Sequence, residues 1–212
     1  MDVPAPVANG TNRIAILAQN ITAVYAFFRK GFSDFKLSLS LSLAASIGAV
    51  GGAFVGVKLD GVWFDRILAI VMILVMISMA TGKKMSHDVN ESTRPNNLVL
   101  GHICMIGAGF WGGFIQVGVG FILMPILHRV MGFNLVRVNM YKVFVVLSYT
   151  IVALAIFATQ LQLLWWAGLG LALGNSIGGW YGAHTTIQKG EVWIKAVMYI
   201  TLSCFIIKLL FF

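Results

Sequence analysis

Apolar runs of about 20 residues, separated by short polar segments, recur along almost the whole chain. A helix rises about 1.5 Å per residue, so each run is long enough to cross a hydrocarbon core of about 30 Å. We expect membrane-spanning helices at 11–28, 35–57, 62–80, 138–157, 161–183 and 192–212. The pattern therefore predicts an all-α, polytopic membrane protein without a separate soluble domain.

Residues 37–43 alternate leucine and serine, a pattern typical of a β-strand. An isolated strand in a bilayer would leave its backbone groups without hydrogen-bond partners, so we expect a helix here. On that helix small residues recur every four positions, first as Ser38, Ser42 and Ser46 and then as Gly48, Gly52 and Gly56. Such a stripe of small residues lets another helix approach closely.

Residues 82–97 form the one strongly polar stretch, rich in turn-forming residues, and we expect an exposed loop there. The segment after it, 98–131, is apolar but interrupted by Gly107, Gly109, Gly112, Gly113, Gly118, Gly120 and Pro125. We divide the chain into a first transmembrane repeat at 1–82, a polar cytoplasmic loop at 83–97 and a second repeat at 98–212. The second repeat contains the glycine-rich segment.

The two halves of the chain share a spacing of residues. A shift of 130 residues superposes Gly48 on Gly178, Gly52 on Gly182, and Trp63 on Trp193. A shift of 129 residues places Arg13 on Lys142. This self-similarity predicts two copies of a three-helix unit.

Basic residues favour the cytoplasmic side of a membrane, so their distribution indicates how the copies are oriented. If the loop that contains Arg29, Lys30 and Lys36 lies inside, its uncharged counterpart at 159–162 fits outside. The two copies then point in opposite directions, as inverted repeats. This arrangement leaves four basic residues outside, Arg13, Lys58, Arg66 and Lys208, and the other eleven of the 15 inside.

The same topology requires both ends of segment 98–131 to lie on the cytoplasmic side. Its 34 residues are too few for two spans of about 20 residues each, so we predict a re-entrant hairpin of half-helices that meet near Gln116. Irregular backbone in a membrane is tolerated where it is buried in protein or lines a cavity. Half-helix starts present free amides and a positive dipole end, which suit an anionic ligand. The alternative is that the glycines only allow close helix packing.

Composition excludes several classes of protein. Hydrophobic residues make up 59% of the chain and charged residues 10%, whereas a soluble domain has about a quarter charged residues. The formal charge of +8 comes from residues spread over predicted loops, which does not favour a nucleic-acid partner. Cys104 and Cys204 lie inside apolar runs without metal-ligand spacing, and we expect buried thiols.

The sequence resembles a known family at the glycine-rich segment. Residues 109–125 (GFWGGFIQVGVGFILMP) and 135–143 (LVRVNMYKV) are similar to the second-repeat signature of the TauE/SafE family of sulfite and organosulfonate exporters. Residues 8–15 (ANGTNRIA) resemble the equivalent point of its first repeat. The resemblance implies a multi-pass transporter of the cell inner membrane. Its substrates would be small anions such as sulfite, sulfoacetate, other organosulfonates, or related sulfur or carboxylate compounds.

Two departures from the family pattern affect these expectations. Gln116 and Val119 stand where many members carry further glycines, which leaves open a substrate other than sulfite. Family members also have a first glycine-rich hairpin before the element at 11–13, and we expect the first repeat to be incomplete at its N-terminus.

The residues that we expect to bind substrate lie near the glycine-rich break and near two predicted helix starts: Gln116, Gly113, Gly118, Gly120, Asn139, Lys142, Asn12 and Arg13. Arg13 and Lys142 occupy matching repeat positions, and charges at membrane depth are usually functional or paired. The alternative is that both side chains extend to lipid headgroups. Asn9 and the two candidate asparagines have amides that suit anion oxygens, or they cap helices.

We expect a small anion and the lipid bilayer as partners, no catalytic residue, no metal site and no cofactor, and we keep open a homo-oligomer. His102 and His184 are weaker candidates, for relaying protons in a coupled transporter. An intramembrane enzyme is disfavoured because no nucleophile, metal or paired-aspartate motif appears. A non-transporting membrane subunit or assembly factor is the alternative function.

Overall fold

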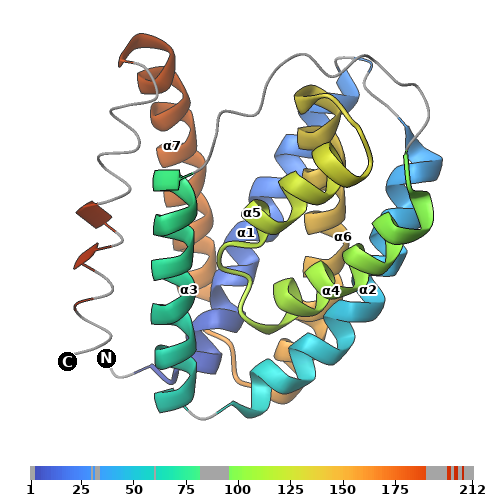
Figure 1. The fold of residues 1–212 in the computed structure, drawn as a ribbon. Coiled ribbons are helices and arrows are strands. Elements are labelled where there is room, and N and C mark those ends of the chain that lie inside the picture. Colours follow the sequence, from blue (N-terminus) through green and yellow to red (C-terminus); the bar gives the residue numbers. More distant parts are fainter. Residues whose placement is uncertain are drawn as a thin grey trace.

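The computed structural model describes residues 3–29, 31, 34–59, 61–81 and 96–189, together with 200, 201, 203, 204 and 207. The described residues form helices and connections, which confirms the all-α fold class (Figure 1). In chain order the elements are α1 (Ala5–Arg29), α2 (Phe35–Lys58), α3 (Gly61–Thr81), α4 (Leu98–Phe114), α5 (Val119–Pro125), the π-helix η1 (Ile126–Val130), α6 (Leu135–Gln160) and α7 (Trp165–Lys189). Most of the predicted loop at 83–97 and most of the predicted helix at 192–212 lie outside these residues.

Helix starts differ from the predicted ones for local reasons. The first helix begins earlier, at Ala5, because Pro6 falls in its first turn, where a missing backbone N–H costs no hydrogen bond. Asn134 sets the start of α6 by accepting a hydrogen bond from the backbone N–H of Arg137 over 2.9 Å. The seventh helix starts four residues later than predicted, because Leu161 is extended at φ −133° and ψ 151°.

The predicted close packing along the small-residue stripe of α2 is confirmed, and the partner is α4. A Cβ added at Gly48 or Gly52 would collide with backbone atoms of Ile106 and Phe110. A Cβ at Gly109 would collide in the same way with the backbone of Ala45. The two helix backbones therefore touch, and larger residues at these glycines would force them apart.

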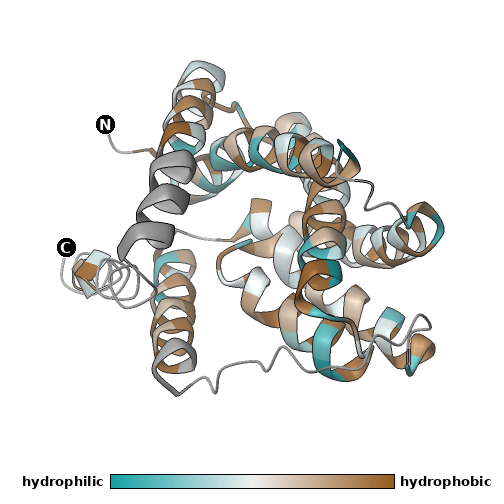
Figure 2. Ribbon diagram, turned by 90° about the horizontal axis from the view of Figure 1, so that it is seen from above, coloured by the Kyte–Doolittle hydropathy of each residue, from teal (hydrophilic) through white to brown (hydrophobic). Residues whose placement is uncertain are grey.

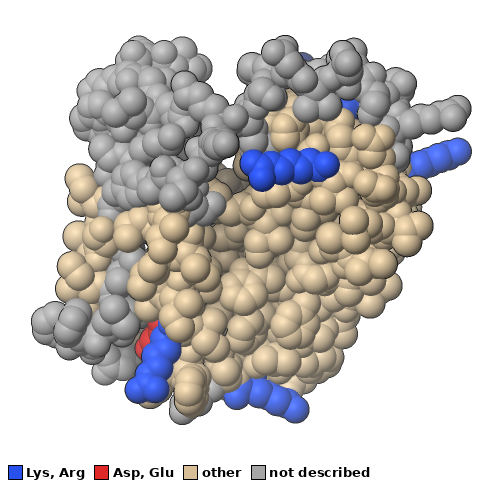
Figure 3. Space-filling view, in the orientation of Figure 1, with Lys and Arg blue, Asp and Glu red and all other residues tan. Residues whose placement is uncertain are grey.

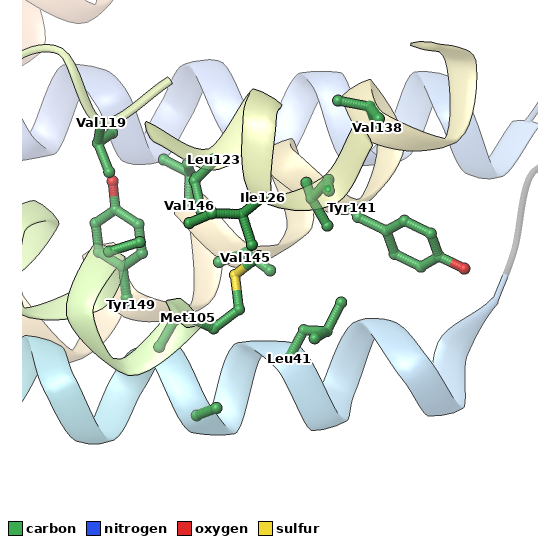
Figure 4. Close-up of a cluster of buried hydrophobic side chains, with 14 of the residues drawn as sticks. Leu41, Met105, Val119, Leu123, Ile126, Val138, Tyr141, Val145, Val146 and Tyr149 are labelled. Atoms are coloured by element: carbon green, nitrogen blue, oxygen red, sulfur yellow. The ribbon is translucent and has the colours of Figure 1, made fainter. Parts of the chain in front are cut away.

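The main hydrophobic core lies where α2, α4, α5 and α6 meet (Figure 4). Leu41, Met105, Leu123 and Tyr149 come from these four helices and are all fully buried. A smaller cluster around Phe157 joins the end of α6 to α2 and to the segment before α7. These clusters hold α4 and α5 at fixed positions beside α6.

Segment 98–131 turns back on itself. Figure 1 shows α4 running alongside α2, and α5 with η1 returning in the opposite direction. The two ends meet, because the backbone N–H of Asn96 donates to the Met131 carbonyl over 3.0 Å. A Cβ at Gly101 would also contact the Met131 side chain.

The exterior is apolar over a broad band. Figure 2 shows hydrophobic positions on every described helix, and Figure 3 shows a face whose middle carries no described charged side chain. Lysine and arginine side chains lie at the two margins of that face. Among the residues that the structure describes, two helices, Phe35–Lys58 and Leu135–Gln160, are long and apolar enough to cross a membrane.

Candidate functional site

The helical chain is broken at residues 115–118, as predicted. The fourth helix ends at Phe114, and α5 begins at Val119. Gln116 and Gly118 both have positive φ, 70° and 75°. Positive φ is ordinary for glycine but uncommon for glutamine, so the surrounding structure must hold Gln116 in this conformation.

Arg13 and Asn9 cap the C-terminal end of α4. The Arg13 guanidinium donates from Nη1 to the Gly112 carbonyl over 3.0 Å and from Nη2 to the Gly113 carbonyl over 2.6 Å. Asn9 donates from Nδ2 to the Phe114 carbonyl over 2.8 Å. Carbonyls at a helix C-terminus lack intrahelical partners and carry negative dipole charge, so a cation and an amide stabilise them. This cap fixes where the broken segment turns.

The position of Arg13 differs from the expected one. It lies about two turns inside α1 rather than at a helix start. Its side chain is fully buried and does not extend to the surface, and the guanidinium lies 4.6 Å from the centre of the Phe157 ring. Within the described residues no carboxylate pairs with Arg13, and its Nε has no hydrogen-bond partner. The break therefore contains a buried positive charge that has no ionic partner among the described residues.

Three polar side chains lie at or beside the break. Gln116 is buried, and its Nε2 donates to the Thr150 hydroxyl over 3.2 Å. Its Oε1 and the Tyr149 hydroxyl have no hydrogen-bond partner in the described structure. The Tyr149 hydroxyl passes beside Gly112, where a Cβ would lie 2.9 Å from the oxygen. The sequence predicted that Gln116 lies at the break, but it did not identify Tyr149 and Thr150 of α6 as its neighbours.

Lys142 and Asn139 form a separate pair nearer the start of α6. The Lys142 ammonium donates to Asn139 Oδ1 over 2.8 Å, and both side chains are half-buried. Thr150 follows Lys142 by eight residues, which is about 12 Å along the helix axis. The structure thus brings Arg13 to the end of α4, just before Gln116, and leaves Lys142 about two helical turns from Thr150.

The remaining predicted site residues take different positions. Gly113 packs against the backbone of Ala49, so it serves close packing as well as the cap. A Cβ at Gly118 would lie 2.8 Å from the Val75 side chain, whereas one at Gly120 would meet no atom within 4 Å. Asn12 is half-buried and makes no side-chain hydrogen bond within the described part of the chain.

The third helix covers the break from one side. Phe64 of α3 clusters with Phe114 and Ile115, and Ile67 and Leu68 pack against this cluster. Two cavities lined by described residues lie elsewhere. One, of about 260 Å³, is lined by residues that include Phe28, Asp34, Ser38, Met140 and Phe144. The other, of about 540 Å³, lies between α1 and α7 and is lined by residues that include Ala18, Trp166, Leu169 and Ser176.

The histidines with described side chains are held by local partners. His102 Nε2 lies 2.7 Å from the Ser40 hydroxyl, and its Nδ1 lies 2.8 Å from the Leu98 carbonyl. His128 is buried, with Nδ1 2.8 Å from the Phe133 carbonyl. The side chain of His184 lies outside the described residues. His102 therefore joins α2 to α4, away from the break.

Tyr149 and Thr150 are the residues that sequence reasoning missed. Tyr149 lies seven residues after Lys142, so the two share one face of a helix. This seven-residue spacing could have indicated Tyr149 as a site residue, but the apolar run around Tyr149 is typical of an ordinary core residue.

Comparison with known proteins bears on what this arrangement does. Residues 1–209 match the model of a family described as Sulfite exporter TauE/SafE. A Sinorhizobium protein named Probable membrane transporter protein ORF9 is 25% identical over 208 residues, with 98% of this chain and 79% of the relative covered. A Haemophilus influenzae probable membrane transporter protein is 22% identical, covering 93% of this chain and 77% of the relative.

The Escherichia coli K12 protein named Probable membrane transporter protein YfcA is 22% identical, covering 100% of this chain and 81% of that protein. No solved structure matches the chain. The family match spans nearly the whole sequence, including α1, the break and α6. The chain therefore belongs to the TauE/SafE family of membrane transporters.

Proposed function

We propose that this protein carries small anions, such as sulfite, organosulfonates or related sulfur or carboxylate compounds, across the cell inner membrane. The anion binds at the break between α4 and α5. The observation that carries the proposal is Arg13, a fully buried guanidinium that has no carboxylate partner within the described residues.

The electrostatics of the break favour a bound anion. An isolated charge buried in protein is costly unless it is paired, and one helix C-terminus supplies only about half a negative charge. Arg13 therefore leaves a net positive field next to Gln116. The free Nε of Arg13 and the Tyr149 hydroxyl are hydrogen-bond donors in the same region.

The arrangement of charges supports a multi-pass protein with its broken segment re-entrant from the cytoplasmic side. Arg29, Arg129 and Arg137 belong to the end of the bundle where α1 and η1 end and α6 begins. Lys58 and Arg66 belong to the opposite end, where α2 ends and α3 begins. More basic residues at the first end agree with a cytoplasmic location for it. Transport then follows from rocking of one inverted repeat against the other around the site.

The test is anion flux in proteoliposomes made with purified full-length protein. We expect efflux of labelled sulfite or methanesulfonate and no flux of potassium ions. Gln116→Glu places a carboxylate next to the break and should remove anion flux, because it neutralises the field of Arg13. Gln162→Glu is the matched control, since it makes the same chemical change at an exposed residue between α6 and α7. Equal flux in the two variants, or no anion flux in the native protein, contradicts the proposal.

A further inference from the structure

Two buried tyrosines of α6 differ in how their hydroxyls are satisfied. Tyr141 and Tyr149 are both fully buried. The Tyr141 hydroxyl donates to Asp34 Oδ2 over 2.7 Å. The Tyr149 hydroxyl has no partner among the described residues. The second tyrosine therefore has an unused donor inside the protein.

An unused hydroxyl in a core is unfavourable, because the group loses its hydrogen bonds to water and gains none. A phenylalanine would fill the same space without this cost. Native structures seldom leave a buried polar group unpaired, so each such group calls for an explanation such as a bound water, ion or ligand. The hydroxyl at Tyr149 therefore calls for a partner beyond the described residues.

The surroundings of Tyr149 indicate the charge of that partner. The Arg13 charge and the Gln116 amide both act on the Tyr149 hydroxyl, although neither side chain makes a hydrogen bond of standard geometry with it. Figure 4 shows it directed toward Val119, the first residue of α5 after the break. Gly112 makes this position possible, because a Cβ there would lie 2.6 Å from Tyr149 Cζ. The donor thus lies at the break, next to a buried cation.

We propose that Tyr149 binds the transported anion directly, by donating its hydroxyl to an oxygen of a monovalent oxyanion that lies next to Arg13. This inference rests on the proposed function and names the substrate class of the same site. The free Nε of Arg13 supplies a second donor, and Gln116 Oε1 accepts from an anion that retains a proton.

A monovalent anion fits the charge of the site better than a divalent one. The positive charge of Arg13 is already partly offset by the carbonyls at the end of α4. A single negative charge leaves the buried site close to neutral. A doubly charged anion such as sulfate would leave an uncompensated negative charge in the protein interior, which is unfavourable.

The test compares Tyr149→Phe with Tyr141→Phe in the full-length protein. The probes are methanesulfonate, which is monovalent, and sulfate, which is divalent. Binding is measured by the rise in unfolding temperature with anion concentration, and flux by efflux from proteoliposomes. In Tyr149→Phe the apparent Kd for methanesulfonate should rise about 10-fold or more, as expected for loss of a hydrogen bond to a charged group. Tyr141→Phe should retain the native affinity, and the native protein should favour methanesulfonate over sulfate.

The outcomes separate this inference from the proposed function. If the native protein neither binds nor transports either anion, the proposed function fails. If it binds methanesulfonate and Tyr149→Phe binds it equally well, Tyr149 is not a ligand and this inference fails. Sulfate bound as tightly as methanesulfonate would refute the monovalent class.

A second measurement has a refuting outcome that is read in the native protein alone. Methanesulfonate should shift a tyrosine C–O band in the difference infrared spectrum of the native protein and of Tyr141→Phe. The shift should be absent from Tyr149→Phe. A native spectrum in which methanesulfonate binds without moving a tyrosine band would overturn the inference.

Discussion

The predicted repeat aligns Arg13 with Lys142, yet the structure uses the two residues differently. Arg13 is fully buried and holds the end of α4 through backbone carbonyls. Lys142 is half-buried and donates to the neighbouring Asn139. Positions that the repeat aligns therefore need not have the same role. Arg13 positions the break and supplies its positive charge, whereas the Lys142 ammonium keeps hydrogen-bond donors for other partners.

Replacing Arg13 gives the largest expected effect. Arg13→Gln leaves carbonyls at the end of α4 without partners inside the core, which should outweigh the relief from removing a buried charge and lower the stability by about 1–3 kcal/mol. Anion flux should be lost as well. Arg13→Lys should recover only part of the stability, because an ammonium cannot reproduce the two guanidinium hydrogen bonds. Thermal unfolding in detergent and proteoliposome efflux measure both effects, and unchanged stability in Arg13→Gln would show that the cap is not needed.

Lys142→Ala should affect transport without affecting the fold. The ammonium makes its hydrogen bond within its own helix, so its loss should change the stability by less than about 1 kcal/mol. We expect anion flux to be abolished while the protein still inserts in the membrane. Efflux and protease accessibility in vesicles measure the two properties. Native flux in Lys142→Ala would remove this residue from the site and leave Arg13 as its cation.

Asn9→Ala tests the smaller part of the cap. This change removes the hydrogen bond to the Phe114 carbonyl, while the Arg13 hydrogen bonds remain. We expect a loss of about 1 kcal/mol in stability and a partial loss of flux. Asn12→Ala, three residues along the same helix, is the control, since the Asn12 side chain makes no hydrogen bond within the described residues. Equal unfolding temperatures for the two variants would contradict the assigned role of Asn9.

Asn139→Ala gives the smallest expected effect. The partially exposed hydrogen bond to Lys142 should contribute only a few tenths of a kcal/mol to stability. If Asn139 orients the ammonium toward the substrate, the half-saturation concentration for the anion should rise while the maximal flux stays unchanged. A fall in maximal flux alone would instead indicate that the pair acts during the movement of the repeats.

Local features of the sequence predicted much of the fold. The glycines of α2 predicted a close helix contact, and the glycine-rich segment 98–131 predicted a break near Gln116. Both follow from the size and backbone freedom of single residues. The hydrogen-bond partners of Arg13 could not be predicted from the sequence. The carbonyls of Gly112 and Gly113 lie about a hundred residues away along the chain, and periodicity carries no information on such a pairing.

The contact between α3 and the break consists of carbon against carbon. Val71 and Val75 lie against Gly118, and Phe64 lies against Ile115. Separating these surfaces breaks no hydrogen bond between the valine, phenylalanine and isoleucine side chains named here, so the free energy required depends on what takes their place. Acyl chains solvate such surfaces about as well as protein does, whereas wetting costs about 25 cal/mol for each Å² exposed. Movement of α3 that exposes these surfaces only to lipid therefore requires little free energy. Movement that admits water requires free energy in proportion to the apolar area exposed.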